Sequence, residues 1–465
     1  MLVNSLNFKS DNYINKTPQN LPQKDYVSSS LNSFKLEQMA NINKMALDMV
    51  KMPEKFSRHN LDNYYGCLIG GAVGDAFGAV IEPVSLEVIK SRYGAEGLRY
   101  LPLRNGVARI TDDTQMSLFT AYAVIKSKIK NNGEYIEEDL LSELANAYKN
   151  WYLTQTSEFI EPVENNFLLN DERLYSRRFP GNTCMEALEK DVLGTIDEPI
   201  NDSKGSGGVM RAAPIGLGLY DDPDFAFSIA QKSAAMTHGN PKGYLPAGAL
   251  AYMIAYILKG DDLCNALDKT IVKLQDYSIE GIELAELLKK AAEYAAYGLD
   301  DNEAIENLGQ GWHGDEALAI SVFCALKHKD DFKEAVIASV NHSGDSDTTG
   351  AITGNILGAY LGADKIKSSL KNKIELYDLI TQISSDLYSS PGDIKNAKSK
   401  YGVEMKEISS KERQKEDEFS FRTAGIKFSS YDIDKLKELP IKEAMEYRRN
   451  LILNGLYNLA EDSSD

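Results

Sequence analysis

The stretch GCLIGGAVGDAFG (residues 66–78) carries a glycine at every fourth position, and GAITGNILGAYLG (residues 350–362) repeats that spacing later in the chain. Residues four apart lie on one face of an α-helix, so each stretch predicts a helix with a stripe of glycines. Glycine costs ~0.5–1 kcal/mol at a helix-interior position relative to alanine, so four on one face require a compensating contact. We expect the two helices to cross at the centre of the core, and loops are the alternative.

The sequence around these stretches predicts an all-α core. Over residues 61–395, apolar runs with helical spacing alternate with Gly, Asn and Asp, and extended β-type alternation is scarce. Residues 1–60 are rich in Asn, Ser, Gln and Lys, a composition that favours a flexible N-terminal extension. Residues 396–465 combine a stretch of mixed charge with near-helical apolar spacing after residue 432, which predicts a helical C-terminal appendage.

The charge and the cysteines exclude several classes of protein. The 465 residues include 51 Lys+Arg and 69 Asp+Glu, for a net charge of -18, which argues against nucleic acid as the main partner and against an anionic membrane surface. The four cysteines form no C-x-x-C pair and the N-terminus is polar, so we expect reduced thiols and a cytoplasmic protein. The apolar stretch 243–258 is shorter than the ~20 residues of a usual membrane span, and we interpret it as a buried helix.

Two clusters of acids and hydroxyls each precede an apolar helical segment: TDDT (residues 111–114) and GDSDTT (residues 344–349). Taken singly, each is typical of a helix start, where Thr or Asp caps the helix and acids favour the first turn. If the clusters converge, their aspartates bring together about four negative charges, which ionise together only beside cations. Oxygen ligands without a neighbouring Cys or His favour Mg²⁺ or Mn²⁺, and two divalent ions would balance four carboxylates.

Five segments, taken in order, give a specific resemblance. They are residues 66–82, residues 110–115 (ITDDTQ), residues 205–217 (GSGGVMRAAPIGL), residues 237–250 with 311–326, and residues 341–362. Together they resemble the ADP-ribosylglycohydrolase family, which includes the dinitrogenase reductase-activating glycohydrolase and the ADP-ribosyl-arginine and ADP-ribosyl-serine hydrolases. The resemblance covers about residues 61–365 and implies a compact orthogonal multi-helix bundle.

The resemblance also implies a site with two divalent metal ions. By position, the metal ligands are Thr111, Asp112, Asp113, Asp345, Asp347 and Thr348. Glu82 matches a glutamate that approaches the metals and gates or assists the reaction in some members, and an exposed helix-end carboxylate is the alternative. One of Glu82, Asp113 and Asp347 is implied as the catalytic proton acceptor, and a protonated partner would assist the leaving group.

A glycine-rich loop and two histidines are the candidate substrate contacts. A loop of this kind lets backbone N–H groups approach a pyrophosphate and ribose closely, although Ser206 stands where many relatives carry Asn. His238 lies in a segment resembling the family's Thr-His motif, and His342 precedes Asp345 by three residues; for both, a core or helix-cap role is the alternative. Trp312 is expected to be a packing residue. The candidate substrate-binding residues are Gly205, Ser206, Gly207, Gly208, His238 and His342.

The function implied by the resemblance is a metal-dependent hydrolase that removes ADP-ribose from modified proteins, with arginine as the favoured acceptor. Two alternatives stay open. The extension at residues 1–60 and the acidic surface suit an immunity protein that blocks an ADP-ribosyltransferase toxin, with or without hydrolysis, an arrangement that some bacterial relatives resemble. A degenerate member would bind ADP-ribose without cleaving it, although all six expected ligand positions hold competent residues.

Overall fold

The structure is a computed structural model, and it describes residues 57–159, 163 and 165–403. The expectations for residues 1–56 and for the helices after residue 432 lie outside the described residues. Within the described part the fold is all-α: there is no β-strand, and β-pairing is limited to isolated bridges such as the one between Gly205 and His313. The predicted fold class is therefore confirmed.

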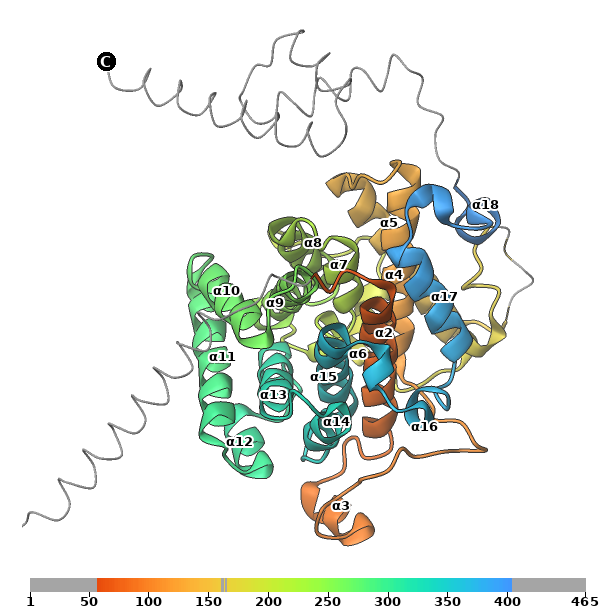
Figure 1. Cartoon of the computed structure of the whole chain (residues 1–465). Coiled ribbons are helices and arrows are strands. Elements are labelled where there is room, and N and C mark those ends of the chain that lie inside the picture. Colours follow the sequence, from red (N-terminus) through yellow and green to blue (C-terminus); the bar gives the residue numbers. More distant parts are fainter. Residues whose placement is uncertain (1–56, 160–162, 164, 404–465) are drawn as a thin grey trace, which may run out of the picture. The chain divides into compact units, whose positions relative to one another are not determined.

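Helices supply nearly all of the regular structure in the described residues. The α-helices are α2 (Leu61–Gly78), α3 (Leu86–Tyr93), α4 (Asp112–Lys130), α5 (Glu137–Thr156), α6 (Asn182–Glu189), α7 (Ala213–Gly218), α8 (Pro223–Ala235), α9 (Pro241–Leu258), α10 (Leu263–Gln275), α11 (Ile279–Tyr297), α12 (Asp301–Leu308), α13 (Gly314–Lys327), α14 (Phe332–Val340), α15 (Ser346–Leu361), α16 (Ser368–Lys371), α17 (Tyr377–Tyr388) and α18 (Ala397–Tyr401). Short 3₁₀-helices are η1 (Glu172–Tyr175), η2 (Ser206–Gly208), η3 (Ala363–Lys365) and η4 (Pro391–Asp393). Helix α2 lies at the centre, with α15 on one side and α4 and α17 on the other (Figure 1).

The two glycine-striped stretches are helices that face each other along their lengths in antiparallel orientation. A Cβ added to any of the paired glycines would lie 1.9–2.4 Å from the carbonyl oxygen of its partner, so only glycine permits this approach. The predicted contact is confirmed, with the two helices side by side along the stripes instead of meeting at one crossing point. We call this contact the glycine seam. Its pairs are Gly66 with Gly358, Gly70 with Gly354, and Gly74 with Gly350.

Two buried asparagines fix the register of the glycine seam. The Asn63 side-chain amide donates to the Ala359 carbonyl at 2.8 Å, and the Asn355 amide donates to the Cys67 carbonyl at 2.8 Å. One asparagine comes from each helix, and each bonds to the backbone of the other. A shift of one helix along the other would leave both buried amides without their acceptors, which costs ~1–3 kcal/mol for each unsatisfied group.

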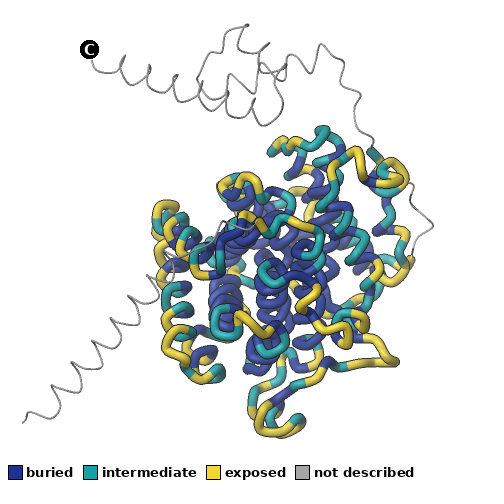
Figure 2. Tube along the Cα trace, viewed as in Figure 1, coloured by how far each residue is buried: buried dark blue, intermediate teal, exposed yellow. Residues whose placement is uncertain are grey.

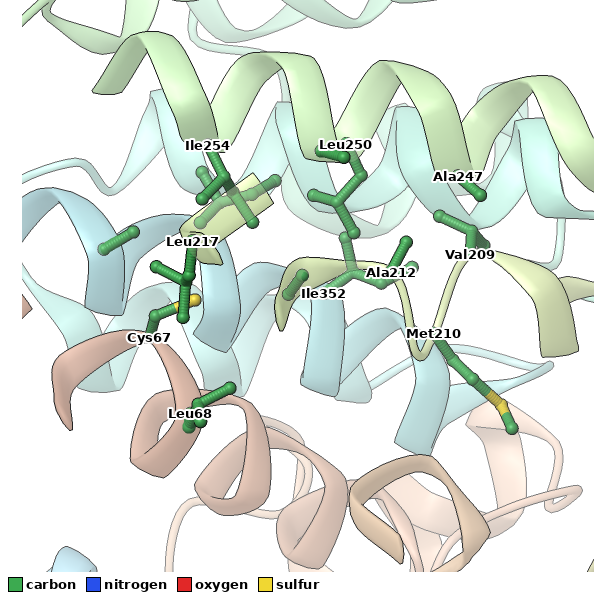
Figure 3. Close-up of a cluster of buried hydrophobic side chains, with 14 of the residues drawn as sticks. Cys67, Leu68, Val209, Met210, Ala212, Leu217, Ala247, Leu250, Ile254 and Ile352 are labelled. Atoms are coloured by element: carbon green, nitrogen blue, oxygen red, sulfur yellow. The ribbon is translucent and has the colours of Figure 1, made fainter. Parts of the chain in front are cut away.

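The core extends from the seam to helix α9. Dark blue segments fill the middle of the described part in Figure 2, and they include most of α9, as expected for residues 243–258. In Figure 3, Leu217 lies between Ile254 of α9 and Cys67 of α2, and Val209 lies beside Ala247 of α9. The glycine-rich loop that precedes Val209 is therefore anchored to the core. No helix among the described residues has the length and apolar character needed to cross a membrane.

Residues 57–60, which the sequence placed in the N-terminal extension, contact the helical core. The Arg58 N–H donates to the Leu258 carbonyl at 3.0 Å, and its guanidinium donates to the Asp261 carbonyl at 2.9 Å. Asn60 is the N-cap of α2, because its side chain accepts a hydrogen bond from the N–H of Asn63. The ordered core therefore begins before the first residue of α2.

Replacing Gly354 by Ala should destabilise the protein strongly. The new Cβ would lie 2.0 Å from the Gly70 carbonyl oxygen, so the helices must separate, and we expect a loss of about 1–3 kcal/mol or more in the free energy of unfolding. Chemical denaturation followed by circular dichroism measures this change. The control is Gly181→Ala, where φ is -59° and an added Cβ meets nothing within 4 Å. Equal stability of the two variants would contradict the role of the seam.

Candidate active site

The glycine seam sets the end of α2 beside the start of α15. A Cβ on Gly78 would lie 2.3 Å from the Asp347 backbone nitrogen, so the last turn of α2 touches the first turn of α15. Glu82 follows directly after this turn. Carboxylate oxygens of Glu82, Asp345 and Asp347 lie within 4.8 Å of one another. The seam thus brings together acids that are far apart in the sequence.

Asp75, a fully buried residue of α2, fixes the start of α4. Its carboxylate accepts hydrogen bonds from the N–H groups of Thr111 and Thr114, at 3.0 and 3.1 Å, and from the Thr114 hydroxyl. Thr111 is the N-cap of α4, and its hydroxyl accepts from the Asp113 N–H at 3.3 Å. The first acidic cluster is therefore held by the same helix that bears the glycine stripe. The only sequence signal for Asp75 was an acid inside an otherwise apolar helix.

Both acidic clusters and the glycine-rich loop line one pocket with about 600 Å³ of empty space. We call it the acidic pocket. Five of the six expected metal ligands lie in its wall, and the sixth, Thr111, is the N-cap of α4 and lines a neighbouring cavity instead. The expected site residues in the wall are Glu82, Asp112, Asp113, Gly205, Ser206, Gly207, His238, Asp345, Asp347 and Thr348.

Two carboxylates have oxygens that helix capping does not use. Asp345 takes the N-cap position of α15, yet its side chain makes no capping bond, and its Oδ2 instead accepts a hydrogen bond from the Ser206 hydroxyl at 2.6 Å. Asp113 Oδ1 is buried without a hydrogen-bond partner. Buried carboxylate oxygens normally have partners, so this orphaned atom fits a cation ligand. The capping interpretation explains Thr111 but does not explain these two acids.

Burial and mutual repulsion act on the acids of this pocket. Burial, followed by the charge of Asp347, raises the pKa of Asp112, Asp113 and Asp345 well above the usual range. Burial, Asp347 and Asp345 raise the pKa of Glu82 to about 10. Among the described residues no lysine or arginine lines the pocket. Oxygen-only donors that need external positive charge suit hard divalent ions such as Mg²⁺ or Mn²⁺.

The glycine-rich loop packs directly on the ring of His238. A Cβ added to Gly205 would lie 3.2 Å from His238 Nε2, and one added to Gly207 would lie 2.9 Å from Cε1 of the same ring. The same Cβ on Gly207 would lie 3.0 Å from Cys184 Sγ. Glycine at Gly207 is therefore needed for the loop to lie this close to the pocket floor.

A buried arginine orients His238. The Arg211 side chain is fully buried and donates to the Thr237 hydroxyl at 2.8 Å, and that hydroxyl lies 2.8 Å from His238 Nδ1. Because the same hydroxyl donates to the Ala234 carbonyl, it accepts from Nδ1–H, which leaves Nε2 as an acceptor beside the loop. Burial and the charge of Arg211 lower the pKa of His238 to about 3, so the ring stays neutral.

Two expected substrate contacts do not line the acidic pocket. His342 is buried, and its Nε2 lies 2.9 Å from the Thr349 hydroxyl, so the ring packs on the first turn of α15. Burial lowers the pKa of His342 to about 4. Gly208 lies behind the loop, where a Cβ would be 2.8 Å from the Ala234 Cβ. Neither His342 nor Gly208 is among the residues that line the pocket, and both are buried.

The pocket also includes residues that the sequence did not single out. The Gly181 N–H donates to Asp112 Oδ2 at 3.2 Å, and the Asp112 N–H donates to the Arg178 carbonyl at 3.2 Å. Between them, Phe179 is 72% exposed and has φ 52°, a left-handed conformation that is rare for a bulky residue. Trp312, which was expected to be a packing residue, also lines the pocket and is 39% exposed.

Replacing Asp75 by Asn should weaken divalent-cation binding without unfolding the chain. Asn keeps the shape but places an amide donor against the N–H groups of Thr111 and Thr114, which disturbs the turn that carries Asp112 and Asp113. We expect Mn²⁺ affinity, measured by isothermal titration calorimetry, to fall about 10- to 100-fold. The control is Asp386→Asn, another buried carboxylate, which bonds to Lys400 and Tyr401. Unchanged Mn²⁺ affinity in the Asp75 variant would refute the positioning role.

Comparisons with known proteins identify the family of this chain. The chain is 25% identical over 324 residues to the ADP-ribosyl-dinitrogen reductase glycohydrolase of Rhodospirillum rubrum, covering 68% of this chain and 91% of that protein. It is 23% identical over 359 residues to ADP-ribosylhydrolase ARH3 of Gallus gallus, covering 70% and 92%. It is 23% identical over 334 residues to ADP-ribosylarginine hydrolase Tri1 of Serratia proteamaculans, covering 71% and 80%. The model of the ADP-ribosylglycohydrolase family matches residues 57–396, and the chain belongs to that family.

Proposed function

We propose that this protein is a metal-dependent hydrolase that removes ADP-ribose from modified proteins, with arginine as the acceptor. Membership of the family supports hydrolysis of ADP-ribose linkages. Of the similar proteins, one is named for ADP-ribosyl-dinitrogen reductase and another for ADP-ribosylarginine. The observation that carries the proposal is the shared pocket. The acidic clusters, the glycine-rich loop and His238 all line one cavity, where a sugar and its phosphates would meet the metal-binding groups.

Two divalent ions, Mg²⁺ or Mn²⁺, fit the acidic pocket. The oxygen-only donor set and the orphaned Oδ1 of Asp113 support this choice. When bound, the ions would supply positive charge that holds the hydroxyls of the proximal ribose and offsets the negative charge of the site. The residues that would hold them are Thr111, Asp112, Asp113, Asp345, Asp347 and Thr348.

The substrate would be oriented by groups that are already fixed. The N–H groups of Gly205 and Ser206 already donate to Ser203 Oγ and to the Trp312 carbonyl, so within the pocket wall the Gly207 N–H is the loop donor left for a pyrophosphate or ribose. The Ser206 hydroxyl is held on Asp345. His238 Nε2, kept as an acceptor by Thr237 and Arg211, can accept a hydrogen bond from a sugar hydroxyl. Rate enhancement would come from holding the glycosidic carbon in place rather than from a covalent intermediate.

Three carboxylates are candidates for the proton transfer: Glu82, Asp113 and Asp347. Asp113 and Asp347 are buried, whereas Glu82 is only partly buried at the edge of the pocket. A group that accepts a proton from water and returns it to a leaving guanidine must reach both substrate and solvent. Glu82 suits this role best once bound cations offset the charges of Asp345 and Asp347 that raise its pKa, and the two aspartates suit the role of metal ligands.

The test is release of ADP-ribose from defined substrates. The protein with Mg²⁺ is incubated with proteins ADP-ribosylated on arginine, proteins ADP-ribosylated on serine, and ADP-ribosylated nucleic acid, and free ADP-ribose is quantified by chromatography. We expect release from the arginine-linked substrate, loss of release on chelation with recovery on adding Mg²⁺, and background activity in Asp345→Ala. Asp386→Asn, with its carboxylate outside the pocket, serves as the active control.

The outcomes separate the alternatives. If ADP-ribose is released only from the serine-linked or the nucleic-acid-linked substrate, the protein is still a hydrolase but arginine is not its acceptor. If the folded protein binds ADP-ribose and releases none from any substrate, the chain is a binding protein and the proposed hydrolysis is wrong.

A second candidate function rests on residues 1–56, which precede the region that the family model matches. We propose as the alternative that this segment blocks an ADP-ribosyltransferase toxin, and the net charge of -18 would favour a basic partner. Deletion should begin after residue 56, because residues 57–60 contact the core.

The deletion of residues 1–56 should weaken affinity for a cognate transferase by at least about tenfold if the segment occupies its active site. Biolayer interferometry against a panel of candidate transferases measures this affinity. ADP-ribose release by the deleted protein reports whether the core is intact. If every transferase binds the full-length and deleted chains equally, the blocking function is excluded.

A further inference from the structure

A second cavity, with about 1250 Å³ of empty space, shares two wall residues, Glu82 and Phe179, with the acidic pocket. Its wall carries four arginines and partly exposed apolar side chains, including Val80 at 44% and Leu103 at 49% exposure. We call it the arginine groove. Its arginines are Arg104, Arg109, Arg177 and Arg178.

Among the described residues, three of these arginines have no carboxylate partner. Arg178 is held by Glu375 through two hydrogen bonds of 2.8 and 2.9 Å and so serves the structure. In the described part of the chain, no acid forms an ion pair with Arg104, Arg109 or Arg177. Three guanidinium groups without an acidic partner among the described residues line one cavity, and this positive wall stands out in a chain of net charge -18. It suits an anionic ligand.

The arginine groove begins where the acidic pocket ends. Asp112 holds the segment between the two cavities from both sides, through the Arg178 carbonyl and the Gly181 N–H. The exposed side chain of Phe179 belongs to this segment, and both Phe179 and Glu82 line both cavities. A protein chain that carries ADP-ribose into the acidic pocket would leave across Glu82 and Phe179, and the groove lies on that path.

We propose that the arginine groove binds an acidic segment of the modified protein, next to the ADP-ribosylated residue. This inference rests on the proposed function and names the class of protein substrate. Guanidinium groups bind carboxylates in paired hydrogen bonds, and Val80 and Leu103 offer apolar contact to the stems of Glu and Asp. A nucleic-acid strand is a poorer occupant, because its continuous phosphates would extend past the groove onto an acidic protein.

The experiment compares two peptides that carry one ADP-ribosylated arginine. One has Asp and Glu on both sides of the arginine, and the other has Asn and Gln at the same positions. Free ADP-ribosyl-arginine is the minimal substrate. All three substrates are tested with the full-length protein in the presence of Mg²⁺ and with a variant that combines Arg104→Gln, Arg109→Gln and Arg177→Gln. Arg92→Gln, an exposed arginine of α3 that lines neither cavity, is the matched control.

We expect the native protein to show a KM about tenfold lower for the acidic peptide than for the neutral peptide, with the difference shrinking as salt is added. The triple variant should lose this preference and keep the native KM for ADP-ribosyl-arginine. An equal preference in the native and triple-variant proteins would overturn the proposal. So would an equal rise of KM on all three substrates, because the groove would then bind the nucleotide.

Peptide binding separates failure of this inference from failure of the proposed function. If the native protein releases ADP-ribose from no substrate, hydrolysis is disproved and fluorescence anisotropy of the labelled peptides tests the groove. Tighter binding of the acidic peptide, lost in the triple variant and kept in Arg92→Gln, supports the groove. Equal binding of both peptides refutes it.

Discussion

The close approach of α2 and α15 along the glycine seam is the constraint on which the rest of the structure depends. Because the paired glycines have no Cβ, the backbones of the two helices touch. Asn63 and Asn355 fix the register of one helix against the other. The antiparallel arrangement then decides which residues meet: the end of α2 is set against the beginning of α15. Asp75 extends the same control to α4, so the acids of the pocket, which we propose as metal ligands, take their positions from a single helix contact.

Acidic side chains line one cavity and arginines line its neighbour, and Phe179 and Glu82 belong to the walls of both. The acidic pocket lies at the N-terminal ends of α4 and α15, where helix dipoles favour negative charge but cannot neutralise several buried carboxylates. The arginine groove lies on the other side of Phe179. ADP-ribose is itself anionic, so under the proposed function it would enter the acidic pocket with the help of cations, whereas an acidic peptide would need no such help in the groove. The two halves of one substrate would thus be recognised by different means.

The sequence predicted the helical fold and the glycine contact because a four-residue spacing has a direct geometric meaning on a helix. It also identified the acids of the pocket, through their order along the chain. It could not place His342, since closeness in sequence to Asp345 says nothing about the direction of the ring once a helix begins. It missed the arginine groove because Arg104 and Arg177 come from separate loops that only the tertiary fold brings together.

The glycine seam joins segments that are far apart in the chain: the Asn63 and Ala359 hydrogen bond spans 296 residues. During synthesis α2 leaves the ribosome long before its partner exists, so its glycine face stays uncovered until almost the whole core has been made. Contacts of such long range form late and make folding slow. The acidic pocket is therefore one of the last features to appear, and a prematurely ended chain that lacks α15 would carry half of the metal-binding acids and no site.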